Sequence, residues 1–305
     1  MSIIKKKFNI DFVGKAKGFG IFSIVLVILS LGLVAGKGLN YGIDFAGGTE
    51  VQVKLSQVTD LSDVRAALDK LNLGKYQIQG FGEGDEYVVR LPVAEGKTEK
   101  EINTNNNALI DSATKGILNA FTGASIRRVD SVGPQIGSEL KRNGLLAVFY
   151  ALLLILIYVG LRFDYEFAPG AVFCLFHDAI ITVGIFALLN KEINVQILAA
   201  VLTIIGYSLN DTIVNFDRIR ENLATQRKKT LSEIINQSIN ETISRTMLTS
   251  ITTLLAVAAL YTFAGGVIAD FAFTLGIGVI VGTYSSIYVA SPLILVVNKY
   301  RNKTT

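Results

Sequence analysis

The sequence predicts a polytopic α-helical membrane protein with six spanning helices and one α+β domain outside the membrane. Half of the 305 residues are hydrophobic, and the mean hydropathy of +0.47 is high for a soluble chain of this length. The apolar residues gather in six long runs instead of recurring at the spacing of a soluble core. A long stretch between the first two runs alternates apolar and polar residues, which indicates a separately folded domain.

Each apolar run is close to the roughly 20 residues that a helix needs to cross a bilayer core of about 30 Å. The runs cover residues 19–35, 144–161, 170–189, 193–214, 246–263 and 271–297. The first run follows several lysines, as a signal peptide does, but no small-residue cleavage site follows Ala35. We therefore expect a retained anchor. The sixth run is long enough to be tilted or to end outside the hydrocarbon.

Lysines and arginines indicate the orientation of these spans. They gather in the segment 1–18, after the second span, in the segment 215–245 and in the tail 298–305. The short loops on the other side, 190–194 and 264–270, hold only Lys191. Positive residues favour the cytoplasmic side, so we expect both chain ends in the cytoplasm and residues 36–142 outside it.

The domain at 36–142 has the pattern of a ferredoxin-like α+β layer. Strand patterns at 51–55, 76–81, 87–91 and 126–132 are interleaved with helical patterns at 61–71 and 109–121. The resulting order, β-α-β-β-α-β, is typical of that fold. The single cysteine, Cys174, excludes an internal disulfide. Because the domain sequence has no metal-ligand cluster, catalytic nucleophile or phosphate loop, we expect a binding or mechanical role.

Six motifs carry a resemblance to a known family. They are residues 41–50 (YGIDFAGGTE), 132–137 (VGPQIG), 208–212 (SLNDT), 216–222 (FDRIREN), 244–246 (SRT) and 282–290 (GTYSSIYVA). In this order they resemble the SecF family of bacterial protein translocase subunits, from about residue 41 to 293. The stretch 92–125 shows nothing specific to that family.

The resemblance implies a half-size version of an RND-type transporter in the bacterial inner membrane, with the α+β domain in the periplasm. SecF proteins pair with SecD, which supplies six further helices. The pair is expected to use the proton-motive force, or a Na⁺ gradient, to help preproteins leave the SecYEG channel after SecA has pushed them in. YajC and YidC are the further partners implied, and no cofactor is expected.

Asp211 and Arg245 are the charged residues expected to carry the coupling. A charge at bilayer depth is costly and usually faces a bundle interior with a partner. Asp211 lies about 18 residues into the fourth span, toward the cytoplasmic side, and Arg245 opens the fifth span from that side, so they can approach at similar depth. Burial favours the neutral carboxyl and a guanidinium favours the carboxylate, a balance that permits proton exchange. A helix-end aspartate and a positive anchor fit the residues equally well, but the resemblance favours coupling at these motif positions.

His177 and Asp178 lie inside the third span. Histidine titrates near neutral pH, and His177 is the single histidine of the chain. Two interpretations are open: a role in the proton path or in packing against Asp211, and a polar contact between helices. Asn210 is expected as a hydrogen-bonding neighbour in the same polar patch.

Tight turns and close helix packing are predicted at two sets of positions. The motif at 41–50 is expected to turn where the domain leaves the membrane, through Gly42, Asp44, Gly47 and Gly48. Gly133 and Pro134 predict either a hinge or a rigid corner before the second span. Small residues in the sixth span favour close helix contacts, and these are Gly276, Gly278 and Gly282.

The charged segment 215–245 is amphipathic, which predicts one or two short helices along the cytoplasmic membrane face. Its cluster at 227–229 favours anionic membrane lipid as the contact. Nucleic acid is not expected, because no aromatic residues accompany these charges.

Three functions from different classes are compatible with these features. They are an accessory translocase subunit, a half-size RND exporter of lipids or small molecules, and a passive scaffold for the channel. An ATPase is excluded because no Gly-x-x-x-x-Gly-Lys-Ser/Thr loop occurs in the sequence. The sequence has no catalytic constellation, so we do not expect an enzyme.

Overall fold

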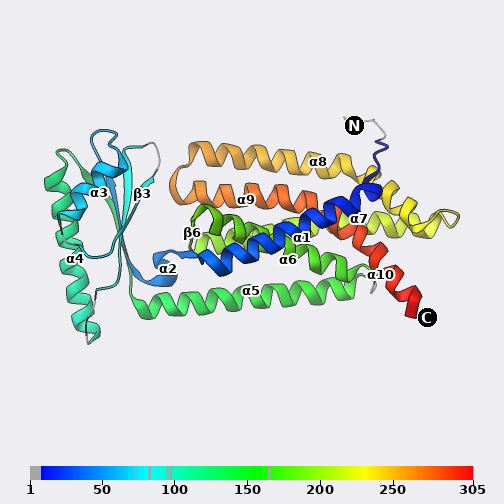
Figure 1. Ribbon diagram of the computed structural model, residues 1–305, viewed down its shortest axis with the longest axis horizontal. Helices are drawn as coiled ribbons and strands as arrows, with labels where there is room; N and C mark the ends of the chain where they lie inside the picture. Colours follow the sequence, from blue (N-terminus) through cyan, green and yellow to red (C-terminus); the bar gives the residue numbers. More distant parts are fainter. Residues whose placement is uncertain are drawn as a thin grey trace.

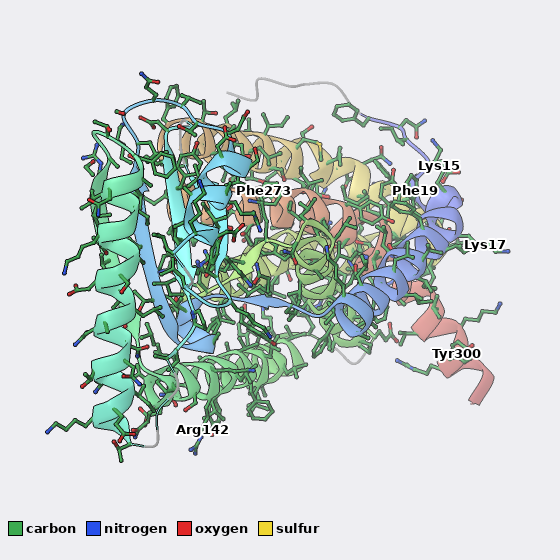
Figure 2. All side chains as sticks on the ribbon, turned by 60° about the vertical axis from the view of Figure 1, so that its left-hand side comes forward. Lys15, Lys17, Phe19, Arg142, Phe273 and Tyr300 are labelled. Atoms are coloured by element: carbon green, nitrogen blue, oxygen red, sulfur yellow. The ribbon has the colours of Figure 1, made fainter. Side chains whose placement is uncertain are left out.

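The computed structural model describes residues 8–304, except 72, 82–83, 95, 97 and 164–165. Figure 1 shows an elongated molecule with an α+β domain at one end and a helical bundle behind it. The bundle begins with α1 (Phe12–Lys37) and ends with α10 (Ser291–Thr304). The start of α1, with Lys15 and Lys17, lies at the end of the bundle away from the α+β domain (Figures 1 and 2).

Six segments of the described chain are long and apolar enough to span a membrane. They are α1, α5 (Pro134–Arg162), α6 (Ala168–Leu189), α7 (Val195–Thr225), α8 (Leu231–Phe263) and the composite segment that starts with α9 (Gly266–Ser285). Half of the most apolar stretch of α6 and of α7 is buried, against 11% in α1 and 6% in α5. The bundle is therefore centred on α6 and α7, with α1 and α5 at its edge.

The sixth span contains a break in its hydrogen-bond pattern. A π-helical turn, η1 (Ser286–Ala290), separates α9 from α10. Such turns frequently occur at functional sites. Ser285 is the last residue before η1. Its buried hydroxyl donates a hydrogen bond to a carboxylate on α6.

The predicted short helices at 215–245 are not separate elements. The structure instead extends α7 to Thr225 and starts α8 at Leu231, so that this segment continues two spanning helices. A capping box explains the start of α8, because Thr230 and Glu233 bond reciprocally to each other's backbone N–H groups. Similarly, α5 begins at Pro134, well before the apolar run at 144–161, and Pro134 suits the first turn of a helix.

The α+β domain confirms the predicted ferredoxin-like order. Its elements are β2 (Gly48–Lys54), α3 (Leu61–Asp69), β3 (Gln77–Phe81), β4 (Glu86–Leu91), α4 (Glu99–Ala120) and β5 (Ser125–Val132). The strands form one antiparallel sheet in the order β3-β4-β2-β5. Alternate residues such as Val51, Val53 and Val89 face a core that Leu68 and Ile117 complete from the two helices.

The opposite face of the sheet is turned toward the bundle (Figure 1), and it holds charged residues that alternate with the core positions, among them Glu50, Lys54 and Arg90. Between the two parts, α2 (Ile43–Ala46) follows the short strand β1 (Asn40–Tyr41). Strand β1 pairs in parallel with β6 (Glu192–Ile193), which lies just before α7. The domain is thus joined by backbone hydrogen bonds to the start of a central helix.

Close contacts between α7 and α9 confirm the expectation for the glycines of the sixth span. A Cβ added at Gly278 would lie 2.2 Å from the Ile204 side chain, and one at Gly282 would lie 3.0 Å from Ser208. At Gly276 the nearest atom, on Val257, would be 3.4 Å away. Of these three glycines, Gly278 therefore has the least room for a side chain.

Candidate functional site

Asp178 on α6 is the centre of a buried polar cluster. Its side chain is inaccessible to solvent. One carboxylate oxygen accepts hydrogen bonds from Ser208 on α7 at 2.5 Å and from Ser285 on α9 at 2.9 Å. The other oxygen lies 2.8 Å from His177 Nδ1, and the Cys174 thiol lies 3.9 Å from the first. Three helices therefore converge on one carboxyl group, which satisfies the hydrogen-bonding needs of a buried polar residue.

His177 connects this cluster to the first helix. Its ring lies 6.2 Å from the ring of Tyr284, between centroids. The Tyr284 hydroxyl is within 2.8 Å of the Ser23 hydroxyl and donates to the Phe19 carbonyl at 2.7 Å. His177 Nε2 is buried and has no hydrogen-bond partner among the described residues. The Tyr284 ring thus lies between α1 and His177, and one imidazole nitrogen of His177 is unused.

Asp211 has a different environment from Asp178. It is only 4% exposed, yet its Oδ2 atom has no hydrogen-bond partner within the described part of the chain. Arg245, on the neighbouring helix α8, is exposed and acts on Asp211 through space. No ion pair of 4.0 Å or less joins the two among the described residues. Asp211 is therefore a buried carboxyl with an unused oxygen and a cation nearby.

Asn210 was expected in the same polar patch, and this prediction is wrong. The structure places Asn210 on the exposed surface of α7, whereas Asp211 and Ser208 are buried. Asn210 is turned by about 100° from Asp211 around the helix axis, which is enough to place it on the exposed side of α7. The described hydrogen bonds also do not link Asp178 to Asp211; Asp178 is bonded to its own cluster instead.

The two carboxyl groups are suited to different tasks. Asp178 is held by donors from three helices, an arrangement that fixes their packing. Asp211 has an unsatisfied oxygen, so a proton, a water molecule or the Arg245 guanidinium can take the vacant position. No group of three or more potential metal ligands occurs in the described residues. Proton or cation exchange at Asp211 is the chemistry that this geometry supports.

The joint between the two parts of the molecule contains the motif residues Gly42 and Asp44. The Gly42 N–H donates to the Ile193 carbonyl at 2.9 Å, and the Val195 N–H at the start of α7 donates to Asp44 Oδ2 at 3.0 Å. A Cβ at Gly42 would lie 2.0 Å from the carboxylate of Glu192. A side chain at position 42 would therefore have to displace the Glu192 carboxylate, which is paired with Arg90.

An ion-pair network spans the same joint. Arg90 on β4 pairs with Glu50 on β2 at 2.9 Å and also with Glu192 before α7. The side chains of Arg90 and Glu192 are only 10% and 9% exposed. A largely buried guanidinium therefore bridges the α+β domain and the bundle, a contact that the sequence analysis did not predict. The acidic and basic residues of the strands were visible in the sequence, but their pairing partners were not.

The positions Gly47, Gly48 and Pro134 form a packed corner, whereas a Cβ at Gly133 would meet no atom within 4 Å. Gly47 and Gly48 have φ angles of +73° and +125°, which residues with a side chain rarely adopt. A Cβ at Gly47 would lie 3.3 Å from the Pro134 backbone, and one at Gly48 would lie 2.6 Å from the Leu91 carbonyl. Pro134 is therefore packed against Gly47, and the hinge and the rigid corner at Gly133 and Pro134 both stay predictions.

Comparison with family models gives two matches. The model described as "Protein export membrane protein SecD/SecF, C-terminal" matches residues 113–300. The model described as "SecD/SecF GG Motif" matches residues 32–57, which include the corner glycines and the joint. The matched segments therefore cover the helical bundle except for most of α1, and the turn that connects the bundle to the α+β domain.

Several proteins resemble the chain over nearly its full length. Protein translocase subunit SecF of Calditerrivibrio nitroreducens is 47% identical over 305 residues, covering 99% of both chains. The same subunit of Magnetococcus marinus is 44% identical, covering 98% of this chain and 95% of that one. The crystal structure of SecDF from Thermus thermophilus superposes with a TM-score of 0.83 at 36% identity. It covers 99% of this chain, which spans 40% of the SecDF chain.

Proposed function

The chain belongs to the SecF family of protein translocase subunits, and we propose that it acts with a SecD subunit to drive protein export with an ion gradient. In this proposal it helps preproteins leave the SecYEG channel after SecA has pushed them in. The membrane is the bacterial inner membrane, with the α+β domain in the periplasm. YajC and YidC are the further partners.

The observation that carries the proposal is the state of Asp211. Burying a carboxyl oxygen without a hydrogen-bond partner costs free energy of folding. A functional reason for this cost is that the oxygen binds different partners in turn. When the carboxyl is charged, it attracts Arg245; when a proton or a metal cation neutralises it, that attraction is lost. The arrangement of α7 against α8 then depends on the occupant of Asp211, as a gradient-driven switch requires.

Helix α7 supplies a route from Asp211 to the α+β domain. Asp211 lies 16 residues after Val195, which corresponds to about 24 Å along a continuous helix. The first turn of this helix is bonded to Asp44, and Glu192 just before it is paired with Arg90. A movement of α7 would therefore act directly on the domain that, in this proposal, contacts the exported chain.

The exposed side of α7 and α8 supports the pairing with SecD. Asn210 and Arg245 are exposed there, although both lie in or beside spans. Polar groups do not stay exposed to hydrocarbon, because each unsatisfied group costs several kcal/mol. We assign this face to the SecD helices, with Arg245 placed between the two subunits.

Export in inside-out membrane vesicles tests the proposal. Vesicles containing SecD and either the wild type, Asp211→Asn or Arg245→Met are given a preprotein, with and without an ionophore. We expect both variants to lose the gradient-dependent part of export and to retain the part driven by ATP. Replacing the H⁺ gradient by a Na⁺ gradient identifies the coupling ion.

Asp217→Asn is the matched control on the same helix. Asp217 is 41% exposed and paired with Arg162, so its neutralisation should leave gradient-driven export unchanged. Co-purification with SecD confirms that each variant has assembled. Unchanged export in Asp211→Asn would instead indicate a passive scaffold. Association of the chain with itself and not with SecD would indicate a half-size exporter.

A further inference from the structure

An apolar cavity opens at the edge of the bundle, on the side of the α+β domain. It has a volume of about 350 Å³, which is at the small end of the range for ligand sites. Helices α1, α5, α6 and α7 contribute its walls, with Leu31, Val148, Phe176 and Ile197 among the lining residues. The cavity lies where α5 runs along the edge of the bundle (Figure 1), with only 6% of its most apolar stretch buried.

One charged residue marks the outer end of this cavity. Among the described lining residues, Lys141 alone carries a charge. It precedes the apolar run of α5, so it lies at the depth where the hydrocarbon meets the headgroups. Its ammonium group is 4.4 Å from the centroid of the Tyr41 ring, and no carboxylate among the described residues pairs with it. The neighbouring Arg142 projects from α5 away from the bundle (Figure 2).

We propose that this cavity binds an anionic phospholipid of the leaflet next to the α+β domain. One acyl chain fills the apolar space between α5 and α6, and the phosphate lies against Lys141. A continuous apolar wall with a single unpaired cation at its polar end complements this kind of amphiphile in both shape and charge. Water is not a suitable occupant, because buried water needs two to four polar partners.

A lipid at this position would contact the joint between the two parts of the molecule. Tyr41 belongs to β1 and Phe45 to α2, and both line the cavity. Their neighbours Gly42 and Asp44 bond to the segment that starts α7. The bound lipid thus packs beneath the connection through which the bundle holds its α+β domain.

Fluorescence quenching by brominated lipids can test this proposal, because the chain contains no tryptophan. Phe176→Trp places a fluorophore in the cavity wall. Phe173→Trp is the matched control, since Phe173 lies one turn away on α6, is outside the lining, and is similarly exposed, at 46% against 43%. Each variant of the full chain is reconstituted in vesicles with brominated phosphatidylglycerol or brominated phosphatidylcholine at equal mole fractions.

We expect quenching of the Phe176→Trp variant to show that the cavity binds phosphatidylglycerol about fivefold more tightly than phosphatidylcholine. One basic residue near anionic headgroups contributes about this factor. The Phe173→Trp variant should show no such preference. Adding Lys141→Ala to Phe176→Trp should abolish the preference, and Lys141→Arg should retain it. Because Lys141 is exposed, neither change should affect folding. Val148→Trp on α5 is a second reporter from the opposite wall.

Three results would overturn the proposal. Equal quenching of the Phe176→Trp variant by the two lipids would show that the cavity selects no headgroup. A preference that survives Lys141→Ala would show that this ammonium is not the phosphate ligand. If either lipid quenched the Phe173→Trp variant but neither quenched the Phe176→Trp variant, another protein segment would have to cover the cavity.

Discussion

Two buried carboxyl groups in neighbouring helices illustrate how local contacts assign different roles to the same residue type. Asp178 accepts from two serine hydroxyls and is in contact with an imidazole, so its removal would leave the buried Ser208 hydroxyl without this acceptor. A buried donor that loses its acceptor typically lowers the free energy of unfolding by about 1–3 kcal/mol. Asp211 retains an unsatisfied oxygen. The contacts of the first aspartate are those of a residue that holds helices together, and the second is the carboxyl to which we assign exchange in the proposed function.

Gly278 provides a prediction at the residue scale. A Cβ there would lie 2.2 Å from the Ile204 side chain, so Gly278→Ala must displace α9 from α7 or force Ile204 from its rotamer. Overpacking of this kind typically costs about 1–3 kcal/mol. We expect Gly278→Ala to lower the stability of the bundle by this amount in equilibrium unfolding with sodium dodecyl sulfate in mixed micelles.

Gly276→Ala is the control for that measurement, because its added Cβ would make an ordinary contact 3.4 Å from Val257. Both substitutions replace glycine by alanine in the same helix, so the gain in helix propensity is the same. The difference in stability between the two variants then reports the difference in their neighbours. Equal stability of the two variants would contradict the close approach of α9 to α7 at Gly278.

At the scale of elements, the joint between the α+β domain and α7 combines a short parallel strand pair with a largely buried ion-pair network. The β1–β6 pair aligns Tyr41 with Ile193. Arg90 then connects the open face of the sheet to Glu192. Because backbone pairing and charge pairing act on the same few residues, we expect the joint to loosen as a unit.

Arg90→Met should loosen this joint. The substitution leaves Glu50 and Glu192 without their shared cation in a site that is mostly closed to water. Removing one partner from a buried pair typically costs about 3–5 kcal/mol. We expect faster hydrogen exchange at the Gly42 and Val195 amides, which are bonded across the joint, as measured by mass spectrometry.

Arg128→Met is the surface control, because Arg128 is 70% exposed and pairs within its own strand with Asp130. Adding Glu192→Met to Arg90→Met should recover part of the lost protection, since it removes an unpaired charge. If Arg90→Met left exchange at both amides unchanged, the network would not hold the domain in place.

At the scale of the whole molecule, the charged end of the bundle and the α+β domain are on opposite sides of the apolar region (Figures 1 and 2). The α7–α8 connection, with its basic residues at 227–229, lies at the end away from the sheet. The positive-inside tendency assigns this end to the cytoplasm. The orientation follows as a prediction that two surface cysteines can test.

Asp111→Cys on α4 and Arg227→Cys before α8 are suitable reporters, since both native side chains are exposed. The natural Cys174 is buried and should not react. In intact spheroplasts, a membrane-impermeant maleimide should label Asp111→Cys and should label Arg227→Cys only after permeabilisation. The reverse pattern would contradict the predicted orientation.

The sequence alone determined the six spans, the order of the α+β domain and the family. Spans depend on the length and composition of local runs, and the domain order depends on local periodicity, so neither requires knowledge of distant contacts. The same local patterns failed where helices extend beyond their apolar runs, because capping and backbone bonding, which act independently of hydropathy, set the ends of α5 and α8.

Tertiary structure alone decided which polar side chains meet. Helix α6 is apolar around its circumference, so no polar stripe indicates which side faces the bundle. Only the packed structure turns Asp178 toward serines of α7 and α9, and Asn210 outward. Likewise, Arg90 and Glu192 are about a hundred residues apart, and their pairing depends on how the sheet is set against the bundle. Local sequence encodes neither helix rotation nor domain placement, because both result from packing between distant segments.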